Sequence, residues 1–180
     1  MDIKEKPLVN RVASSGLITI NLEELYPQDE VRDFDLTDYL YKGLILKEKD
    51  FRADLKSHDW SQYKDKHLCV FCSTDAIIPI WAYMLVATYA EPFALNLHYG
   101  NQQDFLNTFF HDRLQSYDLQ TFRDKKVVIK GCSNKPVPTS AYFELTKLLR
   151  PIVQSMMYGE PCSTVPIFKK SKRVTQRSLD

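Results

Sequence analysis

Three cysteines are each followed by serine and then by threonine or asparagine, and this recurring turn is the main candidate for chemistry in the chain. The segments are Cys72-Ser73-Thr74, Cys132-Ser133-Asn134 and Cys162-Ser163-Thr164. The thiolate is the reactive form of cysteine, and it is stabilised by nearby hydroxyl and backbone N–H donors or by a helix N-terminus. The pattern therefore predicts either a thiol nucleophile or a set of thiols that binds a metal.

The metal hypothesis uses Cys72, Cys132 and Cys162, with His98 or Asp75 as the fourth ligand. Three thiolates and an imidazole suit tetrahedral zinc, and thiolates also hold iron–sulfur clusters. The spacing matches no standard zinc or ferredoxin pattern, however, and free cysteine is among the most buried residue types. On the residues alone, structural cysteines at loop starts rank ahead of a metal site.

A fourth cysteine, Cys69, forms a Cys-x-x-Cys pair with Cys72. In thioredoxin-like proteins such a pair lies in a turn that opens a helix. Here the pair spans the end of an apolar strand, where an odd separation points the two side chains to opposite faces. We therefore predict that Cys69 belongs to the core. A disulfide or sulfur relay between Cys132 and Cys162 stays open.

Alternating strand and helix patterns must position these residues. We predict strands at 17–22, 67–71, 93–97, 126–130 and 165–169, and helices at 35–55 (which Gly43 can divide), from Asp75 or Pro79 to 89, at 101–117, and at 139–156 with a kink at Pro151. This order is typical of parallel βαβ units. The predicted fold is α/β, a three-layer sandwich with a mostly parallel sheet, helices on both faces and a last strand that can be antiparallel.

In this topology Cys72, Cys132 and His98 each follow a strand, at the carboxyl edge where parallel sheets bind ligands. Cys162 lies between the last helix and the last strand. It joins the other three only if that strand is antiparallel or if its loop reaches across the sheet.

The composition bounds the class of protein. The 180 residues suit one domain at 17–170, between a flexible arm at 1–16 and a disordered basic tail at 171–180. The net charge of +1 gives no field that favours nucleic acid or a membrane surface. No apolar run reaches the roughly 18 residues of a membrane span, and the N-terminus lacks a secretion signal, so we expect a cytoplasmic protein with reduced thiols.

Motifs for other common chemistries are missing from the sequence. Neither GxGxxG nor a P-loop occurs, so no nucleotide cofactor is predicted. The nucleophile-elbow pattern GxSxG is missing too.

The cysteine turns lie in segments that resemble an uncharacterised domain family of Bacteroidetes-type bacteria. The segments are FCSTDAIIP at 71–79 with WAYM at 81–84, KGCS at 130–133, GEPCSTVP at 159–166 and EKDFR at 48–52, and the resemblance covers roughly residues 16–170. The family has no established activity. Its genes often lie beside sulfur-mobilisation genes for iron–sulfur cluster assembly, so the resemblance implies, by association, a role with iron–sulfur assembly proteins as partners.

Three functions stay open from the sequence. The first is an accessory factor that handles metal or sulfur through the cysteine turns. The second is a small enzyme or sulfur carrier with Cys72 or Cys132 as its nucleophile. The third is a protein-interaction module whose cysteines are only structural.

Overall fold

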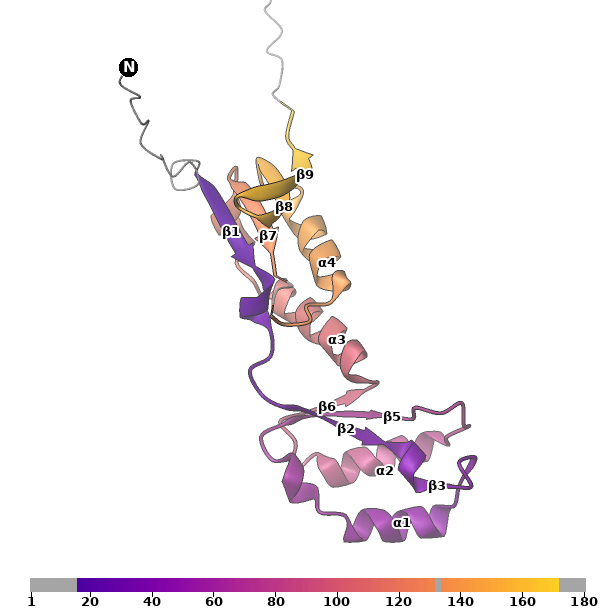
Figure 1. Cartoon of the computed structure of the whole chain (residues 1–180). Coiled ribbons are helices and arrows are strands. Elements are labelled where there is room, and N and C mark those ends of the chain that lie inside the picture. The colour runs from indigo at the N-terminus through magenta and orange to yellow at the C-terminus, as the bar shows by residue number, and fades with distance from the viewer. Residues whose placement is uncertain (1–15, 132–133, 172–180) are drawn as a thin grey trace, which may run out of the picture. The chain divides into compact units, whose positions relative to one another are not determined.

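The computed structural model describes residues 16–131 and 134–171, which form two compact units (Figure 1). Unit 1 combines the residues up to Tyr26 with those from His111 onward, and unit 2 is the continuous stretch Pro27–Phe110 between them. The predicted arm and tail lie almost entirely outside the described residues. The assignment of 17–170 to a single domain stays a prediction.

Unit 2 is built on a parallel sheet of three strands in the order β2-β5-β6. The strands are β2 (Val31–Asp35), β5 (His67–Phe71) and β6 (Asn96–Tyr99). The central strand β5 is the predicted strand 67–71, and four of its five residues are buried. A strand buried on both faces reads as a continuous apolar run, which is why its bounds were predicted correctly.

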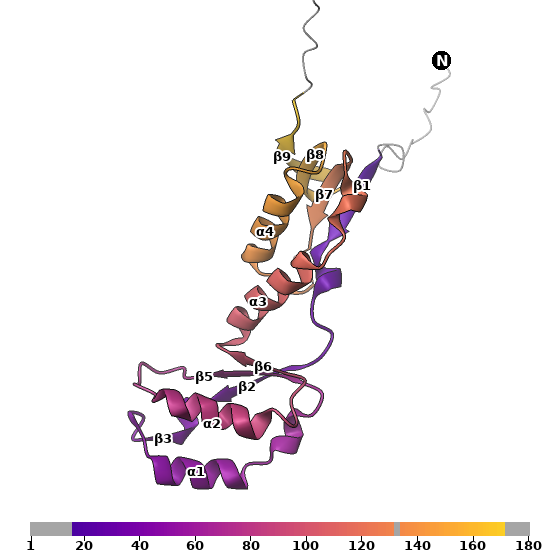
Figure 2. The same ribbon diagram turned by 180° about the vertical axis from the view of Figure 1, so that it is seen from behind.

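Helices pack on both faces of the sheet of unit 2, and two of them lie along the same face (Figure 2). On one face, α1 (Glu48–Ser57) and α2 (Ile80–Ala90) share a buried cluster with the strand residues Leu68 and Val70. On the other face, Phe105 of α3 (Gln102–Gln115) contacts the His67 and His98 rings, with centroids 4.8 and 5.7 Å away. The predicted three-layer arrangement is confirmed in this unit.

The predicted helix at 35–55 is wrong over its first half. The chain there forms the 3₁₀ helix η2 (Leu36–Tyr39), the antiparallel hairpin of β3 (Leu40–Tyr41) and β4 (Ile45–Leu46), and only then α1. Lys42 and Gly43 adopt φ values of 53° and 70°, so they turn the chain instead of interrupting a helix. Leu36 belongs to η2 and Leu40 begins β3, so their four-residue spacing does not mark one face of a helix.

Unit 1 is built on a sheet of four strands in the order β1-β7-β8-β9. The strands are β1 (Leu17–Asn21), β7 (Lys126–Lys130), β8 (Ser155–Glu160) and β9 (Ser163–Lys169). The first three run parallel and β9 is antiparallel to β8, as predicted for the last strand. The α4 helix (Thr139–Leu149) lies along this sheet (Figure 1). The α/β class with mostly parallel strands is confirmed, although the described strands form two main sheets instead of one.

The predicted kinked helix at 139–156 is also wrong in its last turns. Pro151 follows the end of α4 at Leu149, and Met156 is a buried residue of β8. Proline cannot donate the backbone hydrogen bond that the next turn needs, so it ends this helix instead of bending it. Gly159 lies inside β8, paired with Thr164.

Short 3₁₀ helices complete the described part of the chain. They are η1 (Leu22–Leu25), η3 (Trp60–Tyr63) and η4 (Leu119–Phe122), and each is capped by the side chain of the preceding Asn or Asp. Within the described residues, no helix is long and apolar enough to cross a membrane.

Candidate functional site at Cys72

Cys72 lies at the carboxyl ends of two neighbouring parallel strands of unit 2. It follows β5 directly, and the last residue of β5, Phe71, pairs in register with Asp35, the last residue of β2. Parallel strands end at the same edge of their sheet, so the loop after β5 meets the η2 helix after β2. This is the edge at which α/β sheets bind ligands.

Two threonine hydroxyl groups contact the Cys72 sulfur, and a serine hydroxyl contacts one of the two threonines. The Cys72 Sγ lies 3.3 Å from Thr74 Oγ1 and 3.5 Å from Thr37 Oγ1, and Thr37 Oγ1 lies 3.1 Å from Ser73 Oγ. The sulfur belongs to a partly exposed residue, so solvent and a reactant can approach it. The Cys-Ser-Thr turn therefore supplies hydroxyls to its own thiol, as predicted, and η2 adds one more.

The hydroxyl groups change the acidity of the thiol. Partial burial of Cys72 works against the thiolate, but hydrogen bonds from Thr74 and Thr37 outweigh it and hold the pKa of Cys72 below the ordinary value for cysteine. A lower pKa increases the thiolate fraction at neutral pH, and the thiolate is the nucleophile and the metal ligand.

Asp35 fixes the geometry of the site. Its Oδ1 accepts hydrogen bonds from the backbone N–H groups of Thr37 (2.9 Å) and Ser73 (3.0 Å), so one carboxylate joins the loop after β2 to the loop after β5. Partial burial would raise the pKa of Asp35, but the hydrogen bonds from Ser73 and Thr37 dominate and lower it.

We expect Asp35→Asn to weaken the acid dependence of folding. A carboxyl whose pKa is lowered by folding stabilises the native state above its unfolded pKa, and this contribution is lost as the pH falls through the folded pKa. The wild type should therefore lose stability on acidification over that window, and Asp35→Asn should lose less. Urea unfolding at a series of acidic pH values measures the difference, with the exposed Asp65→Asn as the matched control. If the free energy of unfolding fell equally with pH in the wild type and in Asp35→Asn, the carboxylate of Asp35 would not join the two loops as described.

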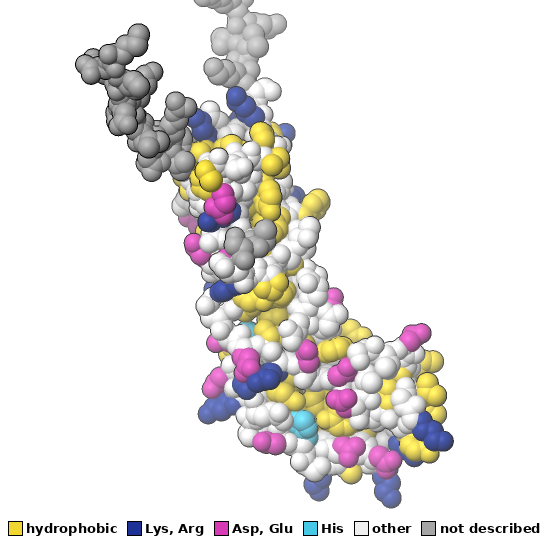
Figure 3. Space-filling model, viewed as in Figure 1, with side chains coloured by type: hydrophobic (Ala, Val, Ile, Leu, Met, Phe, Trp, Pro, Cys, Tyr) yellow, Lys and Arg dark blue, Asp and Glu magenta, His cyan; other side chains and the backbone are white. Residues whose placement is uncertain are grey.

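An apolar cleft of about 410 Å³ lies between the β3–β4 hairpin and the segment that follows the Cys72 turn. Ile77 from that segment and Leu44 from the hairpin line it and are exposed by 93% and 69% of their surface. Hydrophobic side chains gather on this part of unit 2, around β3 (Figure 3). The thiol site therefore adjoins exposed apolar side chains.

The other residues predicted for the site within unit 2 have different surroundings. Cys69 is fully buried, and burial raises its pKa to about 12, so the predicted core role is confirmed. His98 lies inside β6, in register with Cys69, and not after its strand as predicted; its ring packs on Phe105. Burial lowers the pKa of His98, which favours a neutral ring. Asp75 is exposed and lines the apolar cleft.

The remaining two cysteines of the predicted metal set belong to unit 1. Cys162 is an exposed free thiol in the turn between β8 and β9, and Cys132 lies outside the described residues. Over residues 16–131 and 134–171, no group of three or more His, Cys, Asp and Glu side chains is arranged to hold a metal ion. A metal site that joins Cys72, Cys132 and Cys162 thus stays a prediction.

The sequence did not predict the contact of Thr37 with Cys72, nor the hydrogen bonds by which Asp35 joins the loops after β2 and β5. Asp35 caps η2, because its side chain accepts a hydrogen bond from the backbone N–H of Thr37. The signal that would have led to Thr37 is the strand before it. VRDFD at 31–35 is short and polar at three of its five positions, so β2 was not predicted and its carboxyl end was not placed beside Cys72.

Residues 6–170 match the family described as "Protein of unknown function (DUF2480)". The chain belongs to the DUF2480 family. The match covers both units and all four cysteines, so the Cys72 site lies within the family domain and not in an appendage. Searches of curated proteins and of solved structures gave no match.

Proposed function

We propose that the protein is a sulfur carrier in which Cys72 accepts a sulfane sulfur atom and passes it on. The observation that supports this most directly is the pair of threonine hydroxyls, Thr37 and Thr74, at the Cys72 sulfur. Hydroxyl donors stabilise sulfur anions, which include both the thiolate and the persulfide that it would form. The partly exposed sulfur and the adjacent apolar cleft suit a reaction with a partner protein.

The chemistry is a transfer of sulfur between thiols. The Cys72 thiolate attacks the outer sulfur of a donor persulfide, R–S–SH. A new S–S bond forms on Cys72 while the donor S–S bond breaks, and the electron pair of the broken bond leaves with the donor as R–S⁻. The products are Cys72–S–SH and the donor thiolate. Repetition of the same attack by an acceptor thiolate on the outer sulfur regenerates Cys72.

The partners in this proposal are the class that the family resemblance implies, namely iron–sulfur assembly proteins. One of them would present the persulfide and another would take the sulfur from Cys72. Ile77 and Leu44 offer an apolar surface on which such a partner could dock. The chemistry requires reduced thiols, so it belongs in a reducing compartment such as the bacterial cytoplasm.

A metal-binding role is the second candidate. Zinc or an iron–sulfur cluster would be held by Cys72, Cys132 and Cys162, with His98 or Asp75 as the fourth ligand. The lowered pKa of Cys72 would favour metal binding as it favours nucleophilic attack. The carrier ranks first because the contacts of Cys72 are hydroxyl groups and not other metal-ligating side chains.

The carrier predicts that Cys72 takes up one sulfur atom. Reduced protein is mixed anaerobically with glutathione persulfide and desalted, and the mass of the intact protein is measured by mass spectrometry. We expect the wild type and the control variant Cys162→Ser to gain the mass of one sulfur atom, and Cys72→Ser to gain none. Uptake that persists in Cys72→Ser but disappears in Cys162→Ser would contradict the proposal. Stoichiometric zinc or iron that disappears in Cys72→Ser would favour the metal role instead.

A further inference from the structure

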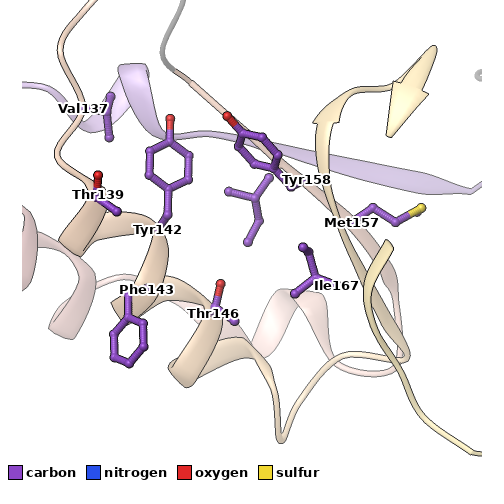
Figure 4. Close-up of a pocket in the computed structure, with 9 residues that line it drawn as sticks. Val137, Thr139, Tyr142, Phe143, Thr146, Met157, Tyr158 and Ile167 are labelled. Atoms are coloured by element: carbon purple, nitrogen blue, oxygen red, sulfur yellow. The ribbon is translucent and has the colours of Figure 1, made fainter. Parts of the chain in front are cut away.

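A cavity of about 510 Å³ lies between α4 and the sheet of unit 1 (Figure 4). Tyr142 and Thr146 from α4 line one side, and Tyr158 of β8 and Ile167 of β9 line the other. Volumes of roughly 300–1,000 Å³ are usual for small-molecule sites. The cavity lies within unit 1 alone and includes none of the groups assigned to the Cys72 site.

The walls of the cavity are apolar surfaces that solvent reaches. Ile167 is exposed by 52% and Tyr158 by 40%, although both belong to strands of a sheet. Tyr142 and Tyr158 are in edge-to-face contact, with ring centroids 5.8 Å apart. A ligand in the cavity would remove this surface from water, which is the main favourable term in binding apolar molecules.

The polar groups of the cavity are hydroxyls. The rings of Tyr142 and Tyr158 point their hydroxyl groups toward the same end, and the Thr146 hydroxyl lies between α4 and the strands (Figure 4). None of the described residues that line the cavity is charged. A phosphate or carboxylate would therefore find no counter-charge in the lining, whereas one neutral hydroxyl or carbonyl group could be hydrogen-bonded.

The edge of the sheet argues against a peptide as the occupant. In the described part of the chain β9 is an edge strand, and Pro166 stands near its middle, beside Ile167. Proline has no N–H group, so an added strand would lose a ladder hydrogen bond at that point. A small molecule needs no such ladder.

We propose that unit 1 has a binding site for a small uncharged molecule with an apolar ring or chain and a single hydroxyl or carbonyl group. The ring or chain lies against Ile167 and the tyrosine rings, and the polar group lies at the tyrosine hydroxyls. The site is independent of sulfur transfer at Cys72.

Nile red tests the site, since it is neutral, apolar and carries a carbonyl group. Its fluorescence is titrated with the full-length protein and with two variants of the cavity wall. Ile167→Thr keeps a β-branched residue on an exposed strand position while removing apolar contact, and we expect it to weaken the affinity by roughly tenfold. Thr146→Phe fills the cavity from α4 and should abolish the saturable signal.

Ile80→Thr is the matched control, since it makes the same substitution at an exposed residue of unit 2 that lines neither cavity. We expect it to leave the Nile red affinity within twofold of wild type. A loss of affinity in Ile80→Thr with none in Ile167→Thr would overturn the proposal. A competition between 1-decanol and decyl sulfate tests the ligand class. Displacement by decanol at the lower concentration supports an uncharged ligand, and the reverse order overturns it.

Discussion

Phe51→Ala should lower the free energy of unfolding of unit 2 by about 3–5 kcal/mol, the usual cost of removing a buried phenylalanine side chain. Phe51 is 1% exposed and lies on the buried face of α1. Its ring contacts the rings of Tyr39 and Trp81, with centroids 5.4 and 6.2 Å away. The substitution therefore removes transfer free energy and also leaves a cavity between α1, η2 and α2.

Tryptophan fluorescence reports on the unfolding of unit 2 alone. The chain contains two tryptophans, Trp60 and Trp81, and both belong to unit 2. Urea unfolding followed by tryptophan fluorescence therefore measures this unit, even if unit 1 unfolds separately. Phe93→Ala is the matched control, because Phe93 is 40% exposed and its substitution should cost about 1 kcal/mol or less. Similar losses for the two variants would contradict the packing of α1 onto this core.

The parts of the fold that could be predicted are those with a strong local signal. The strands at 67–71 and 126–130 contain unbroken apolar runs, at 68–71 and 127–129, and both strands were predicted with the observed bounds. Cys72 could therefore be placed at a carboxyl edge. Of the strands that were missed, β2 pairs with β5, which lies far away in sequence, whereas β3, β4 and β8 lie in segments whose spacing predicted a helix. Met156 is buried by the sheet of unit 1, but the sequence around it fits a helix equally well.

Of the candidate site, only the Cys72-Ser73-Thr74 turn was predicted from the sequence. Thr74 is two residues from Cys72, so its hydroxyl could be expected near the sulfur. Thr37 is 35 residues away and reaches Cys72 through the pairing of β2 with β5, which no local pattern reveals. The role of Asp35 also depends on this pairing, because its carboxylate accepts one hydrogen bond from the segment after β2 and one from the loop after β5. Long-range pairing thus accounts for most of what sequence reasoning missed.

Cys72 should react with iodoacetamide at least 100-fold faster than Cys69 near pH 8. Alkylation requires both access and the thiolate. Cys69 is fully buried, and its pKa of about 12 leaves a thiolate fraction of roughly 10⁻⁴ at that pH. Cys72 is partly exposed, and its pKa lies below the ordinary value. Peptide mapping by mass spectrometry after timed quenching resolves the two sites.

Thr37→Val and Thr74→Val should then move the pH dependence of this alkylation upward. The rate at a thiol rises with pH up to its pKa and levels off above it. Both substitutions keep the shape of the side chain and remove a hydroxyl that stabilises the thiolate, so the levelling should occur at higher pH. Thr88→Val is the matched control, because the Thr88 hydroxyl donates to the Met84 carbonyl in α2 and does not contact Cys72. If all three variants kept the pH dependence of the wild type, the threonine hydroxyl groups would not set the acidity of Cys72. The proposal of a sulfur carrier would then lose the observation that mainly supports it.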